Sequence, residues 1–274
     1  MVERAPRRVA AVSAGPSSAY QGVAAAWARG PAALYDALAT VAIAEVAHEL
    51  AGATVLDVGA GTGALCRALR SAGAVPIAVD TSADMLRLAG AAAAFTVVAD
   101  MCALPINERS VDAAVSGFAI SHLHHPERAL EEMRRVVRPH GRVVAAVFGE
   151  APASAAKDVV DTVVKDYGYQ PPDWYLELKN GTEPRSNTPA LLRHCAESAR
   201  LDAIEVADIS VEPGLDTPEA ITAYRTGLAH VAPFIAALPM AQRDELISRA
   251  VAAVRNRGQA VRPRVLVLSS RVPA

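Results

Sequence analysis

The sequence predicts an α/β protein built on a doubly wound parallel sheet, and three observations lead to this prediction. Residues 54–58 form an apolar run that leads through a glycine-rich turn into a helical pattern, which is the order strand, turn, helix. Further apolar runs follow, and two of them end in an acid, Asp80 and Asp100. Helical patterns separate the runs, as is typical of strands that are joined by crossover helices.

Length and composition restrict the class of protein. The 274 residues suffice for one large domain, or for one domain with an insertion, and 52% hydrophobic residues are ample for a core. The net charge of -2 gives no reason to expect a nucleic acid or an anionic membrane as a partner. No apolar run reaches the ~20 residues that a membrane span needs. The basic N-terminus lacks the apolar core of a secretory signal, and the three cysteines are widely spaced, so we expect a cytoplasmic protein without disulfides or zinc.

Aromatic side chains mark the N-terminal region of a chain that has few of them. We expect a tail up to residue 16 and helices from there to residue 50, with a break at Gly30-Pro31, where the proline can open a second helix. The aromatic residues of this region are Tyr20, Trp27 and Tyr35. They either dock the helices on the domain or belong to a lid in which Tyr20 or Trp27 touches a ligand. For Tyr35, packing is the favoured interpretation.

The glycine-rich turn after the first strand indicates a bound cofactor. Glycine lets the backbone bend sharply and lets a ligand approach it closely, and the carboxyl ends of strands are where open α/β sheets bind ligands. Dinucleotides and S-adenosylmethionine (SAM) both use such a turn. Asp57 favours SAM, because a carboxylate at the strand tip would repel a pyrophosphate but attract an ammonium or a sulfonium group. A turn without any ligand is the third alternative.

The acid after the second strand fits a ribose. Asp80 lies about 20 residues after Asp57, the offset at which an acid in such folds meets a ribose, and a carboxylate can accept a hydrogen bond from both ribose hydroxyls. Thr81 or Ser82 then caps a helix. Met85 lies one turn into this helix, as a core residue or against an adenine ring.

The acid after the third strand fits an adenine. Asp100 is placed to accept a hydrogen bond from an adenine amino group, with Met101 or Cys102 beside it. A single acid at a strand end is usually a turn or cap residue. Three acids at equivalent strand ends line one crevice, because the carboxyl ends of parallel strands meet at the same edge of a sheet.

Three histidines, His122, His124 and His125, follow the fourth strand, in which Ser116 lies near the end. His122 is the candidate general base, because it is nearest to the strand end and because a histidine pKa lies near neutral pH. A polar loop without catalytic function is the alternative for all three. We expect no metal site, since this spacing comes without a nearby ordered carboxylate or cysteine.

The motifs between residues 55 and 148 together resemble those of the class I SAM-dependent methyltransferases, in particular the subgroup (methyltransferase type 11) that includes the quinone-biosynthesis C-methyltransferases. Residues 55–63 match the first motif of this family, Asp80 matches its ribose-binding acid, and Asp100-Met101 match its adenine-binding pair. Residues 129–139 match the following helix and its Pro-Gly-Gly turn. His140 and Arg200 depart from the pattern, because relatives have glycine there. We expect His140 to alter a turn rather than cofactor binding.

The resemblance implies a Rossmann-like sheet of seven strands that ends in an antiparallel hairpin, with N-terminal helices and a helical insertion between strands six and seven. The expected strands are residues 54–58, 75–79, 95–99, 110–117, 142–148, 203–211 and 264–271. The expected insertion, residues 217–256, covers the substrate pocket or is a plain helical cap or dimer surface. We expect a tail and lid over residues 1–50, a SAM-binding core over 51–150, and the rest of the sheet with the substrate loop and insertion over 151–274.

The implied activity is transfer of a methyl group from SAM to carbon or oxygen of a small molecule by in-line displacement. A SAM-binding protein that does not methylate, such as a cyclase or a regulatory partner, is the alternative, and a nicotinamide oxidoreductase is a third hypothesis. We expect a small-molecule acceptor and a possible homodimer, but no nucleic acid and no membrane span. Residues 169–175 and 180–187 are expected to be loop. Within them, Trp174 and Tyr175 could stack on a planar substrate and Arg185 could hold a carboxylate, or these side chains only pack on the surface. The expected cofactor-binding residues are Tyr20, Asp57, Gly59, Ala60, Gly61, Gly63, Asp80, Thr81, Met85, Asp100, Met101 and Ser116.

Overall fold

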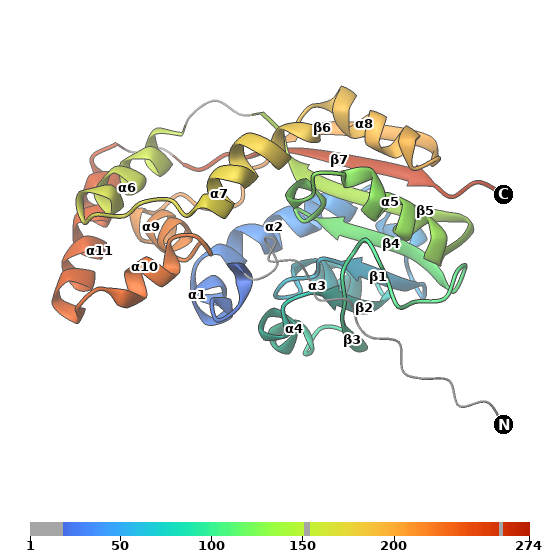
Figure 1. The fold of residues 1–274 in the computed structure, drawn as a ribbon, viewed down its shortest axis with the longest axis horizontal. Coiled ribbons are helices and arrows are strands. Elements are labelled where there is room, and N and C mark those ends of the chain that lie inside the picture. Colours follow the sequence, from blue (N-terminus) through green and yellow to red (C-terminus); the bar gives the residue numbers. More distant parts are fainter. Residues whose placement is uncertain (1–18, 151–153, 258–259) are drawn as a thin grey trace.

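A mixed sheet of seven strands forms the centre of the molecule (Figure 1). The computed structural model describes residues 19–150, 154–257 and 260–274, so the expected N-terminal tail lies outside the described residues. The strand order is β3-β2-β1-β4-β5-β7-β6. The strands are β1 (Thr54–Val58), β2 (Val75–Asp80), β3 (Phe95–Val98), β4 (Val111–Gly117), β5 (Val137–Phe148), β6 (Asp202–Ser210) and β7 (Arg264–Arg271). β7 runs antiparallel to both β5 and β6, and the other pairs are parallel, which confirms the expected fold class.

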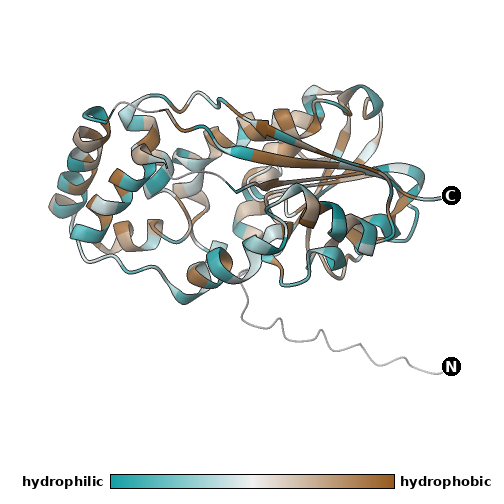
Figure 2. Cartoon of the chain, turned by 90° about the horizontal axis from the view of Figure 1, so that it is seen from above, coloured by the Kyte–Doolittle hydropathy of each residue, from teal (hydrophilic) through white to brown (hydrophobic). Residues whose placement is uncertain are grey.

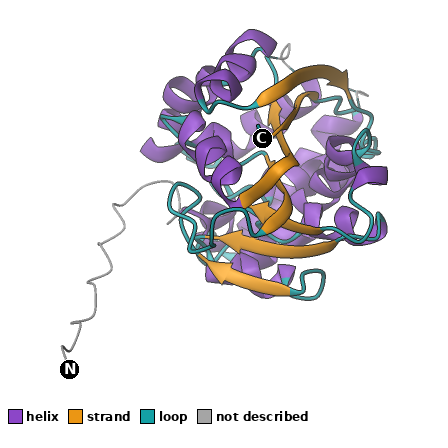
Figure 3. Ribbon diagram, turned by 90° about the vertical axis from the view of Figure 1, so that its right-hand side faces the viewer, coloured by secondary structure: helices purple, strands orange, loops and turns teal. Residues whose placement is uncertain are grey.

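Helices cover both faces of the sheet (Figure 3). A hydrophobic core lies between the sheet and the helices on each face. The first core contains side chains of α2 (Pro31–Ile43) and α3 (Ala64–Ser71). The second core contains side chains of α5 (Pro126–Val136) and α8 (Pro189–Ser198). Neighbouring strand residues alternate between the two, since Val55 belongs to the first core and Leu56 to the second. Figure 2 shows the brown, apolar strands enclosed by helices with teal outer sides. This two-sided burial explains why the strands are nearly continuous apolar runs.

Four helices form a cap at one end of the sheet, on the left in Figure 1. This helical cap consists of α6 (Ala155–Asp166), α9 (Pro218–Thr226), α10 (Ala232–Ala237) and α11 (Met240–Arg255). The last three are the expected insertion between β6 and β7. α11 packs on α6 and α9, and α9 also contacts α2 and α1 (Ala24–Arg29). The N-terminal helices therefore dock on the insertion although the two are far apart in sequence.

The contact between the N-terminal helices and α9 is unusually close and depends on glycine. A Cβ atom on Gly30 would lie 2.0 Å from the carbonyl oxygen of Ala223, and a Cβ on Gly227 would lie 2.6 Å from Pro31 Cδ. Neither position therefore has room for a side chain. The Gly30-Pro31 break separates α1 from α2 and also allows the N-terminal helices to pack closely against α9.

Several expected bounds differ from the structure. β5 begins at Val137 and not at residue 142, because the expected turn at 138–141 joins the sheet through a register shift opposite β4. The two segments expected to be loop, residues 169–175 and 180–187, are in part helical, because they contribute to α7 (Asp173–Glu177), the π-helix η4 (Leu178–Thr182) and η5 (Glu183–Arg185). Leu178 and the aromatic residues of α7 pack into the core or line a cavity, so tertiary contacts outweigh the local turn residues here. The remaining short helices are η2 (Ala47–Glu49), α4 (Ala83–Ala89) and η3 (Ile120–His122).

The two departures from the family pattern adopt the backbone conformation that favours glycine. His140 has φ +65° and Arg200 has φ +57°. Left-handed backbone is unfavourable for a residue with a Cβ atom. His140 and Arg200 therefore occupy positions at which glycine would be less strained, and the expectation that His140 alters its turn stays a prediction.

Candidate active site

The glycine-rich turn is held against the end of β2. The backbone N–H groups of Gly59 and Ala60 donate to the carbonyl oxygen of Val79 over 2.8 and 2.9 Å. Gly59 and Gly61 have φ of +75° and +53°, which favours glycine at both positions. A Cβ on Gly59 would lie 2.4 Å from the Cβ of Ala119, whereas no atom lies within 4 Å of a Cβ on Gly61. Gly59 is thus required by packing, and Gly61 faces open space that a ligand can occupy.

A cavity of about 300 Å³ lies next to this turn, and we call it the glycine-turn cavity. Of the residues expected at the site, those that line it are Tyr20, Asp57, Gly59, Ala60, Gly61, Asp80, Thr81, Met85, Asp100, Met101 and His122. Gly63 and Ser116 do not line it. Gly63 instead lets α3 approach α4, since its Cβ would lie 2.9 Å from Ala89 Cα. Ser116 donates its hydroxyl to the Val58 carbonyl over 2.7 Å and joins β4 to β1.

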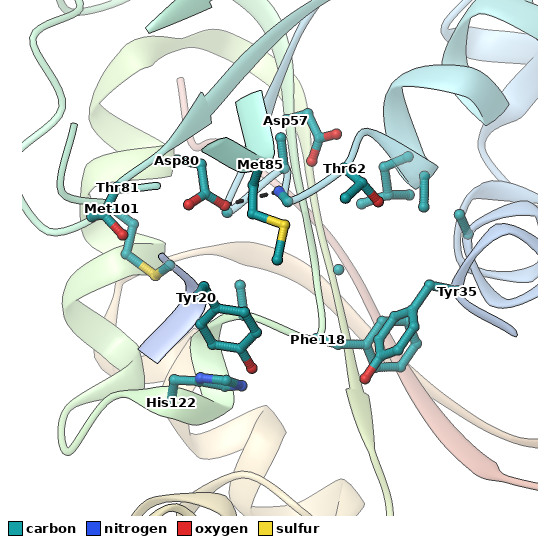
Figure 4. Close-up of a pocket in the computed structure, with 18 of the residues that line it drawn as sticks. Tyr20, Tyr35, Asp57, Thr62, Asp80, Thr81, Met85, Met101, Phe118 and His122 are labelled. Atoms are coloured by element: carbon teal, nitrogen blue, oxygen red, sulfur yellow. Dashed lines mark hydrogen bonds between the residues drawn. The ribbon is translucent and has the colours of Figure 1, made fainter. Parts of the chain in front are cut away.

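The two acids at one end of this cavity differ in their hydrogen bonding (Figure 4). The Asp80 carboxylate accepts from the backbone N–H groups of Gly61 and Ser82, each over 2.8 Å, and burial raises its pKa. Asp57 is fully buried, and its Oδ2 accepts from the Cys66 thiol over 3.1 Å. Asp57 Oδ1 has no hydrogen-bond partner among the described residues. Burial raises the pKa of Asp57 to about 7, so a cation in the cavity would stabilise its charged form.

Aromatic side chains form the opposite end of the cavity. Tyr20, Trp27, Tyr35, Phe118 and His122 lie there, and we call these five residues the shared wall. Adjacent rings contact one another: the centroids of Tyr20 and His122 are 5.7 Å apart, and those of Trp27 and Tyr35 are 4.9 Å apart. The N-terminal aromatics therefore pack together and also line the cavity, and a contact of Tyr20 or Trp27 with a ligand stays a prediction. Tyr35, for which packing alone was favoured, lines it too.

A second cavity, of about 350 Å³, shares these five residues and extends under the helical cap; we call it the cap cavity. The chain has four Phe, two Trp and six Tyr residues. Besides the four aromatics of the wall, those that line the cap cavity are Phe148, Trp174, Tyr175 and Tyr224. Most of the few aromatic side chains of this protein therefore line the glycine-turn cavity or the cap cavity.

His122 is the histidine that touches both chambers. It is half-buried and lines the two cavities, and burial together with the charge of Lys179 lowers its pKa to about 4. Its imidazole is therefore neutral at neutral pH, which leaves a ring nitrogen free to accept a proton, although the lowered pKa makes the ring a weaker base than an exposed histidine. His124 and His125 are exposed, lie 3.7 and 3.0 Å from Glu177 and Glu127, and line neither cavity.

Sequence reasoning missed Phe118 and the residues of the helical cap. Phe118 has φ +59°, a strained value for a bulky side chain, and its ring packs 4.6 Å from that of Phe148. Its position directly after a strand end was the available signal. Lys157 and His230 line the cap cavity, but nothing in the local sequence marks them. Trp174 and Tyr175 line it as expected, whereas Arg185 lines neither cavity and donates to the Gly181 carbonyl.

Comparison with known proteins agrees with this geometry. The family model of a methyltransferase domain matches residues 56–145. The demethylmenaquinone methyltransferase of Clavibacter sepedonicus is 33% identical over 169 residues, which are 60% of this chain and 67% of that enzyme. The chain belongs to the class I SAM-dependent methyltransferases.

Other relatives of this methyltransferase match over shorter stretches. The malonyl-[acyl-carrier protein] O-methyltransferase of Pseudescherichia vulneris is 43% identical over 93 residues, which are 33% of this chain and 37% of that enzyme. The chain thus covers well under half of this relative. The structure of phosphoethanolamine N-methyltransferase 2 from Haemonchus contortus, bound to S-adenosylhomocysteine, superposes over 86% of this chain and 52% of its own with a TM-score of 0.53. At 17% identity this likeness concerns the fold.

The residues present in the methyltransferase fit SAM. The partnerless oxygen of Asp57, the open space above Gly61 and the acceptor positions of Asp80 all face one cavity. Among the described residues no group of three or more His, Cys, Asp or Glu side chains is arranged to hold a metal ion. In that part of the chain, no helix combines the length and the apolar character required to span a membrane.

Proposed function

We propose that this methyltransferase moves the methyl group of SAM to a carbon or an oxygen of a small planar acceptor that binds in the cap cavity. The observation that carries the proposal is the shared wall. Two chambers of about 300 and 350 Å³ meet at the same five side chains, so molecules bound in them would meet there. The size of the cap cavity fits a small molecule.

In this proposal the cofactor lies in the glycine-turn cavity. Asp57 would bind the ammonium group of SAM, Asp80 would accept hydrogen bonds from the ribose hydroxyls, and Asp100 would accept one from the adenine amino group. The residues proposed to surround the rest of the cofactor are Tyr20, Gly59, Ala60, Gly61, Thr81, Met85 and Met101. Gly63 and Ser116 support the site from outside the cavity, through the packing of α3 and the link from β4 to β1.

The chain has three tasks in this reaction. SAM supplies a methyl group that is already activated by the positive charge on its sulfur. The aromatic residues of the shared wall exclude water and hold a planar acceptor in line with the methyl group and the sulfur. The binding free energy of the acceptor is thereby used to align the reacting atoms. His122 is neutral at neutral pH and can take a proton from an acceptor hydroxyl or carbon acid at its ring nitrogen.

Two observations support a small acceptor for carbon or oxygen methylation. The curated relatives include enzymes named for a quinone C-methylation substrate, demethylmenaquinone, and for O-methylation of malonyl-[acyl-carrier protein]. The net charge of -2 gives no electrostatic reason to expect a nucleic-acid substrate. Apart from the shared wall, most side chains that line the cap cavity come from residues 154–264, so we place acceptor choice in residues 151–274.

The test is product analysis. The full-length protein is incubated with SAM and with hydroxynaphthalenes and hydroxybenzoates one at a time, and S-adenosylhomocysteine and the methylated product are measured by mass spectrometry. We expect both to form in equal amounts with at least one acceptor. Binding of SAM by calorimetry without release of S-adenosylhomocysteine from any acceptor would contradict the proposal.

A further inference from the structure

Lys157 stands out among the lysine and arginine residues of the cap cavity because no ion pair or hydrogen bond joins its side chain to a described residue. The other three are paired: Lys179 with Glu183, Arg225 with Asp161 and Arg264 with Asp208. Lys157 has neither an ion-pair nor a hydrogen-bond partner among the described residues. It lies on α6, is partly buried and lines the cap cavity but not the glycine-turn cavity.

The carboxylates near Lys157 compensate its charge only in part, since Asp158, Glu150 and Glu183 line the cap cavity but form no ion pair with it among the described residues. Burial lowers its pKa, and the positive charges of Arg225 and Lys179 lower it further, while Asp158 and Asp161 offset this only in part. Asp161 is already paired with Arg225, and Asp158 is exposed. An anion bound in the cavity would supply the missing charge.

His230 offers a second contact for such an anion. Its ring stacks on Tyr175 with centroids 3.6 Å apart, and its Nδ1 lies 2.7 Å from the hydroxyl of Tyr169. Burial lowers the pKa of His230 to about 3, so the ring is neutral. If the Tyr169 hydroxyl donates to Nδ1, Nε2 carries the proton of the neutral ring. Nε2 is buried and has no partner among the described residues, which leaves it available to donate to a ligand.

Lys157 and His230 both line the cap cavity. The charges of Arg225 and Lys179 act on both, and neither residue lines the glycine-turn cavity. A group bound by these two residues is therefore held away from the cofactor, and the rest of the acceptor extends toward the shared wall.

We infer that the acceptor is a planar aromatic acid whose carboxylate is bound by Lys157 and by Nε2 of His230. This inference rests on the proposed function, because it places the acceptor in the cap cavity. The ring lies among the aromatic side chains of that cavity, where stacking favours a flat molecule. The carboxylate selects the orientation in which the opposite edge of the ring meets His122.

The test compares two probes that differ only in the carboxylate, 6-hydroxy-2-naphthoate, which has its hydroxyl on the edge opposite the carboxylate, and 2-naphthol. Binding of each is followed by naphthol fluorescence and calorimetry on the full-length protein saturated with S-adenosylhomocysteine. We expect the naphthoate to bind at least about tenfold more tightly than the naphthol, as a charge-assisted contact predicts. Lys157→Met should abolish this preference and leave the affinity for 2-naphthol unchanged. His230→Phe, which keeps a ring against Tyr175, should reduce the preference in part.

Lys165→Met is the matched control, because Lys165 lies on the same helix, is exposed and lines neither cavity. It should keep the full preference. Retained binding of S-adenosylhomocysteine shows that each variant is folded. Equal binding of the two probes to the unmodified protein, binding of neither, or a preference that survives Lys157→Met would overturn the inference.

The outcome separates this inference from the proposed function. Carboxylate-dependent binding without methyl transfer to any acceptor would contradict the proposed function and support the anion site. Methyl transfer to 2-naphthol and to the naphthoate with equal kcat/KM would support the proposed function and overturn the anion site.

Discussion

The backbone N–H of Gly61 donates a hydrogen bond of 2.8 Å to the carboxylate of Asp80. This contact joins the glycine-rich turn after β1 to the end of β2, the two segments that border the glycine-turn cavity. A carboxylate has about four acceptor positions, and the N–H groups of Gly61 and Ser82 occupy two of them. Asp80 is therefore oriented by the backbone and still has acceptor positions for a ligand.

Substitution of Asp80 tests the ribose assignment. Asp80→Ala should weaken SAM binding by about 1.5–3 kcal/mol, because charge-assisted hydrogen bonds to the ribose hydroxyls are lost. Isothermal titration calorimetry measures the change. Glu108→Gln, an exposed acid that lines neither cavity, is the control and should bind SAM as the unmodified protein does. An unchanged dissociation constant in Asp80→Ala would refute the assignment.

Asp57 should make the stability of the cofactor-free protein depend on pH. Its folded pKa of about 7 exceeds the ordinary value, so the folded state holds the proton more tightly. The resulting stabilisation is complete below about pH 4 and is lost as the pH rises to about 7. Relative to Asp57→Asn, the unmodified protein should lose on the order of 4 kcal/mol of unfolding free energy over this range.

Urea unfolding at a series of pH values measures this difference. The comparison isolates Asp57, because all other titrating groups are common to the two proteins. Parallel curves for Asp57→Asn and the unmodified protein would show that Asp57 titrates normally.

Substitution of His122 tests the proposed base. His122→Ala should slow turnover about 100-fold while the affinity for SAM stays nearly unchanged, since the ring accepts a proton and does not hold the cofactor. His124→Ala changes an exposed histidine that lines neither cavity and should leave the rate unaffected. Steady-state kinetics and SAM titration together separate the two effects. Full activity in His122→Ala would mean that orientation suffices or that another group takes the proton.

Glycine at the two left-handed positions should stabilise the protein. His140→Gly and Arg200→Gly remove a Cβ atom from backbone at φ +65° and +57°, and each should raise the free energy of unfolding by about 1 kcal/mol. Both side chains are exposed, so little packing is lost. Chemical denaturation gives the values. Arg200→Lys keeps the Cβ and should change nothing; a gain equal to that of Arg200→Gly would rule out backbone strain as the cause.

Features that depend on neighbouring residues were predictable. Asp57, Asp80 and Asp100 each follow or end an apolar run, and the strand, turn and helix around them are set by short-range pattern and turn chemistry. Parallel strands then bring the three acids to one edge, and all three line the glycine-turn cavity. The position of His122 near the same edge was predictable for the same reason, because this residue closely follows a strand end.

Features that depend on distant segments were not predictable. α7 and η4 form where turn residues suggested loop, because packing in the core and against the cap cavity outweighs local preference. Lys157 and His230 lie far apart in the chain, and only the docking of α6 beside the helices of the insertion brings them to one chamber.

The sequence alone determined the sheet, the cofactor-binding edge and the family. Each of these follows from apolar runs and turn residues within segments of fewer than about ten residues, and the same pattern recurs at successive strands. The tertiary structure alone decided the acceptor chamber. Its walls come from the N-terminal helices, the β4 loop and the helical cap, which meet through side-chain packing such as the Gly30–Ala223 crossing. Packing between distant segments leaves no short-range pattern in the sequence, because the stabilising contacts form between surfaces that meet only when the chain folds.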